Sequence, residues 1–492
     1  MNKYFRISII QEYISSKNFL FVLILLSQLL IYYFLKNLNW LGTPNLEVRD
    51  AYSFYVYDFS NIKNFLSQYR SFGGPLFVYI YKLFSADLAN WGTVNYTIYC
   101  FSLVILYFAL CSYKFSQIYS FFFVIGILGS TEIWYHFGYW SESISLSFLI
   151  LSVSLFFFSS TYNKLYLYLL FSFFLFISYQ TRPLLVIFVI FFVMFEFIIL
   201  KFNKSKKIFS IQGLKTISFT LTPLIIFLLI RFFITGHLGI APYVGAHLSS
   251  HTIFHLEDFH INKFSPENKV FAENISIRIK KHKFPCNLSF EQLKDQKLKN
   301  QNYHKCYTYN TMSVLLEMID QQKNLKPFEE NDPRNFNSWE HLVTLDKFFM
   351  SVGNHNEIDQ KLKSFAYEFI SIDSKGYFEQ FKINLLKGYK DIFKINLKLI
   401  YLYFLSFVLF FLIFTFSKNK PKDSQNIIKI HALIIAVVLT NFLSYFFLSA
   451  IHLPKERLLA IQGIFLIPSI GSYLIYLVTT KNILGFKKPS NG

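Results

Sequence analysis

Acidic and basic side chains follow the first long apolar run of the chain. The stretch E-V-R-D-A-Y-S-F-Y-V-Y-D-F (47–59) holds three carboxylates and one guanidinium among five aromatic residues. A carboxylate can act as a general base on a hydroxyl group. A guanidinium can hold a phosphate through two parallel hydrogen bonds. These residue types suit a reaction in which a hydroxyl attacks and a phosphate is held.

Further ionisable residues lie at the ends of other apolar runs, on the side of the chain that we expect to face outside. Such groups are expensive at membrane depth and usually face a cavity. For each residue alone, the simpler interpretation is an interfacial charge that ends a helix. Carboxylates in two loops and cations in two others together indicate a cavity open to the outer leaflet. The candidate residues are Glu47, Arg49, Asp50, Glu132, Glu142, Arg182, His452, Lys455 and Arg457.

The candidate residues lie at the ends of long apolar runs, so the helices that these runs form must position them. Of the 492 residues, 53% are hydrophobic and 16% are charged, which is too little charge for a soluble domain of this length. Several runs reach the roughly 20 residues needed to cross about 30 Å of hydrocarbon. We therefore expect an all-α polytopic membrane protein with about ten transmembrane helices. The runs are 19–35, 92–112, 117–133, 141–160, 164–179, 182–200, 215–235, 396–416, 427–450 and 457–479.

The distribution of charge predicts the orientation. The net charge is +19, and the segments that lie inside if the N-terminus is inside hold 17 Lys/Arg against two acids. The large segment 237–395 on the other side holds 21 Lys/Arg and 19 Asp/Glu. This positive-inside asymmetry predicts that both termini are cytoplasmic. A nucleic-acid partner is not expected, because the basic residues are scattered between the spans.

The spans divide the chain into three predicted parts. The N-terminal membrane module is 1–235, and its first outside loop, 36–91, carries the opening stretch. Residues 236–395 form an extracytoplasmic, mostly helical domain, and 396–492 form a C-terminal membrane module. Within the first loop, residues 70–84 are too short to span and predict a helix on the membrane surface. The first apolar run has no small-residue cleavage site after it and reads as an uncleaved anchor.

Cysteine and histidine residues leave alternatives open. Cys286 and Cys306 form a disulfide if their compartment is oxidising, or stay free. His247, His251 and His255 are spaced by four, so on a helix they would share a face that suits zinc. A polar loop after the seventh span is the preferred interpretation, and we predict no metal and no cofactor. The chain has no G-x-x-x-x-G-K-[ST] motif, which argues against an ATP-driven machine.

Several short motifs resemble those of GT-C class membrane glycosyltransferases. The first-loop acid in E-V-R-D-A-Y-S-F-Y resembles the signature that follows the first span of that class. W-S-E-S-I-S-L-S-F-L-I-L (140–151) is similar to a second-loop motif. T-R-P-L-L (181–185) and E-R-L-L-A-I-Q-G (456–463) are similar to later Arg-bearing segments. Residues 365–381 resemble the stretch before the late spans in bacterial relatives of protein O-mannosyltransferase and lipid A aminoarabinose transferase.

The resemblance implies a reaction and a place for it. A polyprenyl-phosphate sugar in the outer leaflet of a bacterial inner membrane would donate its sugar to the hydroxyl of a glycan, lipid or protein acceptor, with inversion. Asp50 matches the catalytic base, and Glu142 matches a second acid that orients the acceptor. Arg457 and Arg182 match residues that hold the leaving phosphate. The partners implied are this donor, the acceptor and membrane lipids.

The sequence also departs from the family pattern. Arg49 and Asp50 stand where many relatives have paired acids, so Glu47 or Asp58 is an alternative functional carboxylate. Two other functions stay open from the residues alone. One is a flippase or transporter of a lipid-linked or small polar substrate, which should place ionisable residues in mid-span. The other is a polymerase or ligase that joins two lipid-linked glycans.

Overall fold

The structure is a computed structural model in which every described element is a helix. It describes residues 17–42, 51–68, 70–85, 87–130, 134, 137–138, 141–202, 211–280, 301–322, 354–386, 424–451 and 464–479. No strand occurs among these residues. The all-α expectation is therefore confirmed for the described part of the chain.

Six described helical segments are long and apolar enough to cross a membrane. They are α2 (Lys17–Asn37), α6 (Trp91–Ser112), α9 (Ser141–Tyr162), η1 with α11 (Pro183–Ile187 and Phe188–Phe202), α12 (Ile211–Thr235) and α21 (Ser424–Ile451). Three further apolar helices are shorter: α7 (Gln117–Leu128), α10 (Leu165–Thr181) and α23 (Leu466–Thr479). The expected span 396–416 lies outside the described residues, so the number ten stays a prediction.

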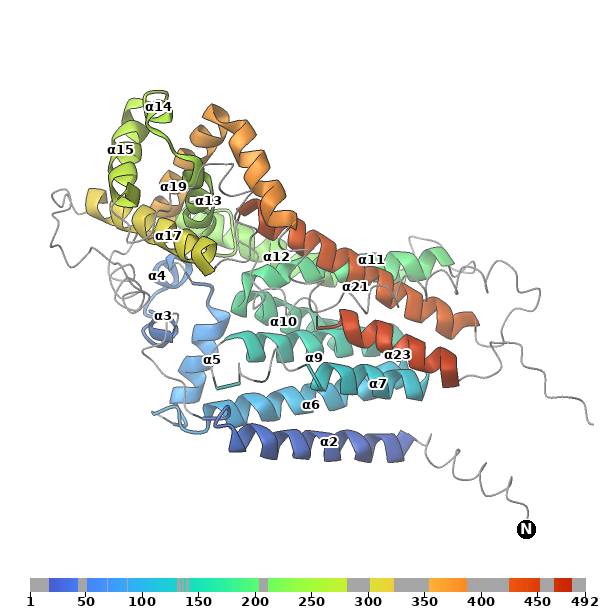
Figure 1. Ribbon diagram of the computed structural model, residues 1–492. Helices are drawn as coiled ribbons and strands as arrows, with labels where there is room; N and C mark the ends of the chain where they lie inside the picture. The colour runs from blue at the N-terminus through green and yellow to red at the C-terminus, as the bar shows by residue number, and fades with distance from the viewer. Residues whose placement is uncertain are drawn as a thin grey trace, which may run out of the picture.

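These helices lie side by side in one bundle (Figure 1). Consecutive helices run in opposite directions, as contacts across the pairs indicate. The Gln28 side chain of α2 donates to the carbonyl of Cys100 in α6, while Tyr107 near the other end of α6 donates to the carbonyl of Lys17. Ser152 of α9 likewise donates to the carbonyl of Phe171 in α10.

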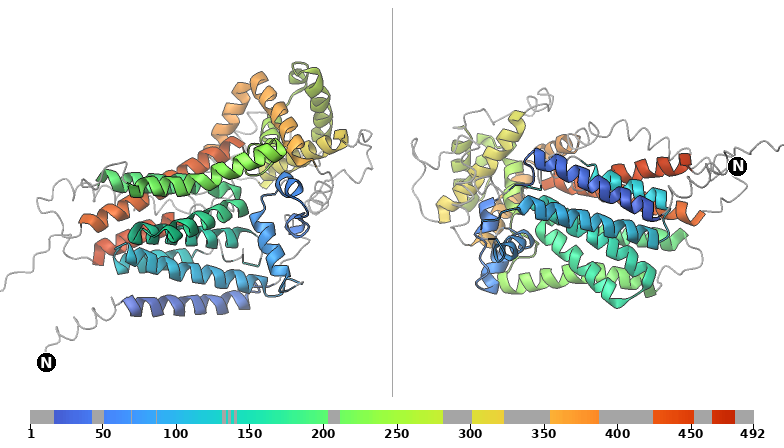
Figure 2. Two further views of the ribbon diagram at one scale, coloured as in Figure 1. Left: turned by 180° about the vertical axis from the view of Figure 1, so that it is seen from behind. Right: turned by 90° about the horizontal axis from the view of Figure 1, so that it is seen from below.

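The two ends of the bundle differ. At one end, which we call the turn end, residues 113–116 and 163–164 connect their helices directly. The other end, which we call the loop end, carries α3 (Ala51–Tyr55), α4 (Ile62–Ser67) and α5 (Gly73–Lys82), and Figures 1 and 2 place all helices between 244 and 386 there too. The expected surface helix is confirmed as a helix, α5, and it crosses the loop end steeply to the bundle axis (Figure 1).

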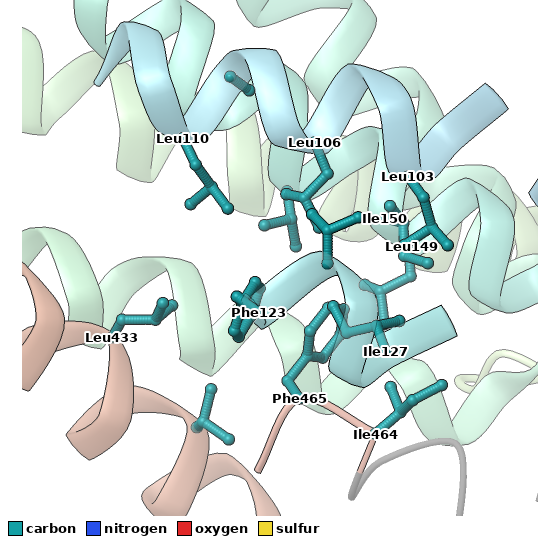
Figure 3. Packing of buried hydrophobic residues seen from close by; sticks show 14 of the residues in the cluster. Leu103, Leu106, Leu110, Phe123, Ile127, Leu149, Ile150, Leu433, Ile464 and Phe465 are labelled. Carbon is teal, nitrogen blue, oxygen red and sulfur yellow. The ribbon is translucent and has the colours of Figure 1, made fainter. Parts of the chain in front are cut away.

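The bundle is held by close apolar packing. Leu103, Leu106 and Leu110 of α6 face side chains of α7 and α9, and Leu433 of α21, Ile464 and Phe465 extend the same cluster (Figure 3). Lipid is as apolar as these side chains, so such a bundle depends on packing and small residues rather than on escape from water. The central helix α9 contributes seven buried serines to this packing. Four of them, Ser145, Ser147, Ser154 and Ser159, donate to carbonyls of their own helix.

A second hydrophobic core lies at the loop end. It is formed by α13 (Val244–Thr252), η2 (Ile253–His255), α14 (Asp258–Ile261), α15 (Pro266–Lys280), α17 (Gln301–Gln322), α19 (His355–Ile372) and the helical residues 374–386. Its members include Ile275, Val314 and Phe365. Cys306 of this core is disulfide-bonded, and its predicted partner Cys286 lies outside the described residues. The mostly helical character is confirmed for the described part; its extracytoplasmic side stays a prediction.

Candidate functional site

Two of the predicted site residues form an ion pair at the loop end. Glu142 lies in the first turn of α9 and has no exposed side-chain surface, while Arg182 follows the last residue of α10. The guanidinium contacts the carboxylate directly. A carboxylate is favoured at a helix N-terminus and a cation at a C-terminus, and the antiparallel pairing of α9 and α10 brings these two ends together. The sequence predicted both residues separately, and the structure joins them.

The other predicted site residues lie outside the described residues. They are Glu47, Arg49, Asp50, Glu132, His452, Lys455 and Arg457. Their described neighbours are informative nevertheless. Helix α3 begins at Ala51, and α21 ends at Ile451, and both positions are at the loop end (Figure 1).

Asp58, the alternative first-loop carboxylate, shapes the local turn. Its two carboxylate oxygens accept hydrogen bonds from the Ser60 backbone N–H (2.7 Å) and from the Asn64 side chain (2.8 Å). Hydrogen bonds from Ser60, and then from Asn64, lower the pKa of Asp58 below its usual range. A carboxylate with a lowered pKa is a weaker base, so these contacts favour a structural role for Asp58.

Arg70 joins the first loop to the helices beyond the bundle, whereas the sequence indicated only that it begins the predicted surface helix 70–84. Its Nε donates to the hydroxyl of Ser53 in α3 (3.2 Å). The guanidinium also lies over the rings of Phe54 (5.6 Å) and Tyr243 (5.8 Å). Stacking between two aromatic rings holds the cation in place. This arrangement holds a cation beside α3, the helix that follows Asp50 in the sequence.

Two glycines allow α5 to pack tightly against this region. A Cβ atom on Gly73 would lie 2.6 Å from the carbonyl carbon of Gln180, and one on Gly74 would lie 2.6 Å from the ring of Phe54. Any larger residue would push α5 away from the end of α10. The G-G-P turn therefore fixes the first loop against the segment that carries Arg182.

A buried polar network connects the bundle to the second core, and nothing in the sequence patterns had singled it out. Arg231 near the end of α12 donates to the carbonyl of Gly239 (2.9 Å) and to the side chain of Asn356 in α19 (3.5 Å). Asp359 accepts from the Gly245 N–H (2.6 Å) and from Lys363 (2.5 Å). These bonds anchor α12, α13 and α19 to one another.

His237 belongs to the same network. Its ring lies 3.8 Å from the carboxylate of Asp359. Burial, and then the positive charges of Arg231 and Lys363, lower the pKa of His237 to about 3. The imidazole is therefore neutral at pH 7, which suits a buried structural contact.

The histidine series lies on a buried helix rather than in the polar loop that we expected. His247 and His251 are in α13, and His251 is only 1% exposed. The series packs because each ring has its own neutral partner. His247 bonds to the Tyr307 hydroxyl (2.8 Å), His251 to Asn384 and His255 to Gln380. Among the described residues, no three His, Cys, Asp or Glu side chains are grouped to hold a metal ion.

An ionisable residue also lies within the bundle. Glu196 of α11 is 4% exposed and close enough to Tyr113 and Tyr168 to act on them electrostatically. In the sequence, V-M-F-E-F-I places this acid within the expected span 182–200. Glu196 belongs to the half of the bundle nearer the turn end.

An apolar cavity of about 520 Å³ lies between α10 and α12. Pro223 lines it and removes the N–H that would bond to the carbonyl of Phe219. Ser172 of α10 donates to that carbonyl instead (2.7 Å). At the loop end, Phe72 contacts two lining residues, Phe176 and Phe227. The cavity thus extends from the bundle toward the first loop.

Comparison with known proteins finds no matching family model, no similar curated protein and no similar solved structure.

Proposed function

We propose that this protein is a membrane glycosyltransferase of the GT-C type that uses a polyprenyl-phosphate-linked sugar. The observation that carries the proposal is the ion pair of the fully buried Glu142 with the largely buried Arg182 at the loop end. Two opposite charges buried at the mouth of an apolar bundle are costly unless they serve a polar ligand or a specific structure.

The proposed reaction balances with the residues available. The acceptor hydroxyl oxygen forms a bond to the anomeric carbon, and the bond from that carbon to the phosphate oxygen breaks. Asp50 takes the hydroxyl proton, and the phosphate leaves on its lipid with both electrons of the broken bond. Arg457 and Arg182 stabilise the leaving phosphate, and Glu142 orients Arg182 and the acceptor.

The apolar cavity supports a donor with a hydrocarbon chain. An isoprenoid chain is long and apolar, with a methyl branch on each five-carbon unit, and an apolar groove between two membrane helices can bind it along the bundle surface. Phe72 links this cavity to the first loop through its contacts with Phe176 and Phe227. The lipid would then present its phosphate toward the loop end.

The proposed place of reaction is the outer face of a bacterial inner membrane, with both termini in the cytoplasm. The excess of basic residues at the predicted inside segments supports this orientation. A cysteine introduced at Ser205 should resist an impermeant thiol reagent in intact cells. Labelling at that position would show that the proposed orientation is wrong and that the loop end does not face the outer leaflet.

A second candidate, a flippase or transporter, is favoured by Glu196. A buried carboxylate inside a helical bundle is a common feature of ion and proton pathways. Its neighbours Tyr113 and Tyr168 would then be part of a polar path from the turn end.

The proposed function is tested with the purified full-length protein in nanodiscs. A polyprenyl-phosphate hexose labelled in the sugar is mixed with lipid, peptide and glycan acceptors, and release of polyprenyl phosphate is measured. We expect release that depends on an acceptor. Movement of the intact labelled lipid between leaflets of proteoliposomes, without release, would support the flippase instead.

A further inference from the structure

Several buried polar side chains at the loop end have atoms without hydrogen bonds. Both amide atoms of Gln180 lack a partner in the described structure, although the residue is fully buried. Four other buried residues each have one side-chain oxygen without a hydrogen-bond partner in the described structure: Ser141, Asn441, Ser444 and Ser449. A buried polar atom without a partner loses its hydration and gains nothing in return.

Many other hydroxyl side chains in the bundle bond within their own helix. Ser154 of α9 donates to the Ile150 carbonyl one turn earlier, and Thr440 of α21 donates to the Ala436 carbonyl. Ser444 and Ser449 lie in the same α21 helix as Thr440 and make no such bond. Unpaired buried oxygens also occur elsewhere in the bundle, as at Ser160 and Thr216, but at the loop end they lie close to the ion pair and find no partner among the described residues.

The unpaired groups surround one turn of the chain. Gln180 lies two residues before Arg182, and Ser141 precedes Glu142, so both residues are close along the chain to the two members of the ion pair. Leu184, just beyond, packs against Tyr445 and Leu448 of α21. In α21 the positions 441, 444, 445, 448 and 449 follow the spacing of a single helix face. Asn441, Ser444 and Ser449 therefore share the face that meets this turn.

The described part of this group has no net charge. Its two ionised side chains, Glu142 and Arg182, neutralise each other, and the rest are amides and hydroxyls. Amides and hydroxyls both donate and accept hydrogen bonds, as the hydroxyls of a sugar do. A ligand with its own charge would remain uncompensated there.

We propose that Gln180, Ser141 and the Asn441–Ser444–Ser449 face of α21 bind the sugar of the donor, and that this sugar is an uncharged hexose. This inference rests on the proposed function, because it assigns the sugar of the same lipid-linked donor. The site should bind uronic acids and amino sugars more weakly, because these sugars carry a charge that the described group does not neutralise. Arg182 and Glu142 remain the boundary between this sugar site and the phosphate.

The test measures the binding of four soluble donor analogues to the full-length protein in nanodiscs. They are farnesyl phosphate without a sugar and farnesyl phosphate carrying a neutral hexose, a uronic acid or an amino sugar. We expect the neutral hexose to bind about tenfold more tightly than the other three, a difference on the scale of one or two hydrogen bonds. Gln180→Leu should abolish this preference and leave binding of farnesyl phosphate unchanged. Ser154→Ala, at a serine already bonded within its helix, is the matched control.

Each outcome separates the two proposals. If farnesyl phosphate binds but the hexose adds no affinity, or if Gln180→Leu keeps the preference, the sugar site is wrong and the lipid-phosphate function stands. If no analogue binds, the proposed function fails and the sugar site falls with it. Thermal melting guards against a folding defect, because removing an unpaired buried amide should not lower stability. If Gln180→Leu does not fold, Ser444→Ala carries the same test with a smaller change in volume.

Discussion

Two buried glutamates occupy opposite halves of the same bundle. Glu142 begins α9 at the loop end and contacts Arg182. Glu196 lies inside α11, toward the short turns, with Tyr113 and Tyr168 nearby. Among the described residues, the additional chain gathers at the loop end: the first loop, α5 and the second core. Burial alone therefore does not define a site; what distinguishes Glu142 is its direct contact with Arg182, at the end where α5 packs against α10.

The largest expected effect tests whether the chemistry belongs to the loop end. Asp50→Asn keeps the shape of the side chain and removes the base, so turnover should fall by about 10²–10⁴, the usual contribution of general-base catalysis. The protein should fold and insert normally. Turnover is measured as acceptor-dependent release of polyprenyl phosphate.

Two neighbouring acids provide controls for that variant. Asp58→Asn should cost much less turnover, because the Asp58 carboxylate already bonds to Ser60 and Asn64. Glu47→Gln should also cost much less. If Asp50→Asn keeps full activity while Asp58→Asn or Glu47→Gln is inactive, the residue of the inactive variant is the base instead of Asp50. Full activity of all three variants would contradict the transferase.

The next effect measures the ion pair itself. Glu142→Gln leaves the Arg182 guanidinium without its buried counter-charge, and we expect a loss of about 3–5 kcal/mol in the free energy of unfolding. The double variant Glu142→Leu/Arg182→Met should regain most of that stability and remain inactive. Thermal melting and turnover are measured on the same samples. If the double variant is active, the ion pair stabilises the structure but is not needed for the reaction.

A smaller effect is expected in the membrane region between the two ends. Ser172→Ala removes the donor to the Phe219 carbonyl and should cost about 1–3 kcal/mol, the penalty for a buried acceptor without a partner. Ser154→Ala is the matched control, because its carbonyl partner Ile150 lies in a regular helix. Equal melting temperatures for the two variants would mean that water or a relaxed helix satisfies the Phe219 carbonyl.

The smallest effect on transfer is expected at the other glutamate. Glu196→Gln keeps the shape of the side chain and lies away from the loop end, so turnover should not change. The same variant is assayed for lipid movement in proteoliposomes. If Glu196→Gln loses this lipid movement and the parent protein shows no transferase activity, the flippase is supported. Its functional site would then lie in the bundle interior at Glu196.

The sequence predicted the apolar helices well because their signal is local. Nine of the ten expected runs contain a described helix, and the ends of α9 and α10 fall within a few residues of the predicted limits. Glu142 and Arg182 could be singled out because charges at the ends of apolar runs are conspicuous. Their direct contact could not be predicted, because it depends on how α9 and α10 pack.

Residues whose role depends on tertiary contacts were harder to recognise. Arg70 looked like an ordinary interfacial charge, since its partners Ser53, Phe54 and Tyr243 are distant in sequence. Arg231 was hidden in the same way, because Asn356 is far along the chain. The histidine spacing predicted a shared face, but the polar partners that fill this face come from helices that no short-range pattern connects.

The proline in α12 has a consequence for how the protein enters the membrane. A helix with a missing backbone hydrogen bond is less stable alone in lipid, because no water can replace the bond there. The donor that completes α12 is Ser172 of α10, which is synthesised first. When α12 leaves the ribosome and reaches the insertion machinery, its partner is already in the bilayer. The order of helices along the chain is therefore also an order of assembly, in which α12 packs against α10 and gains the hydrogen bond from Ser172.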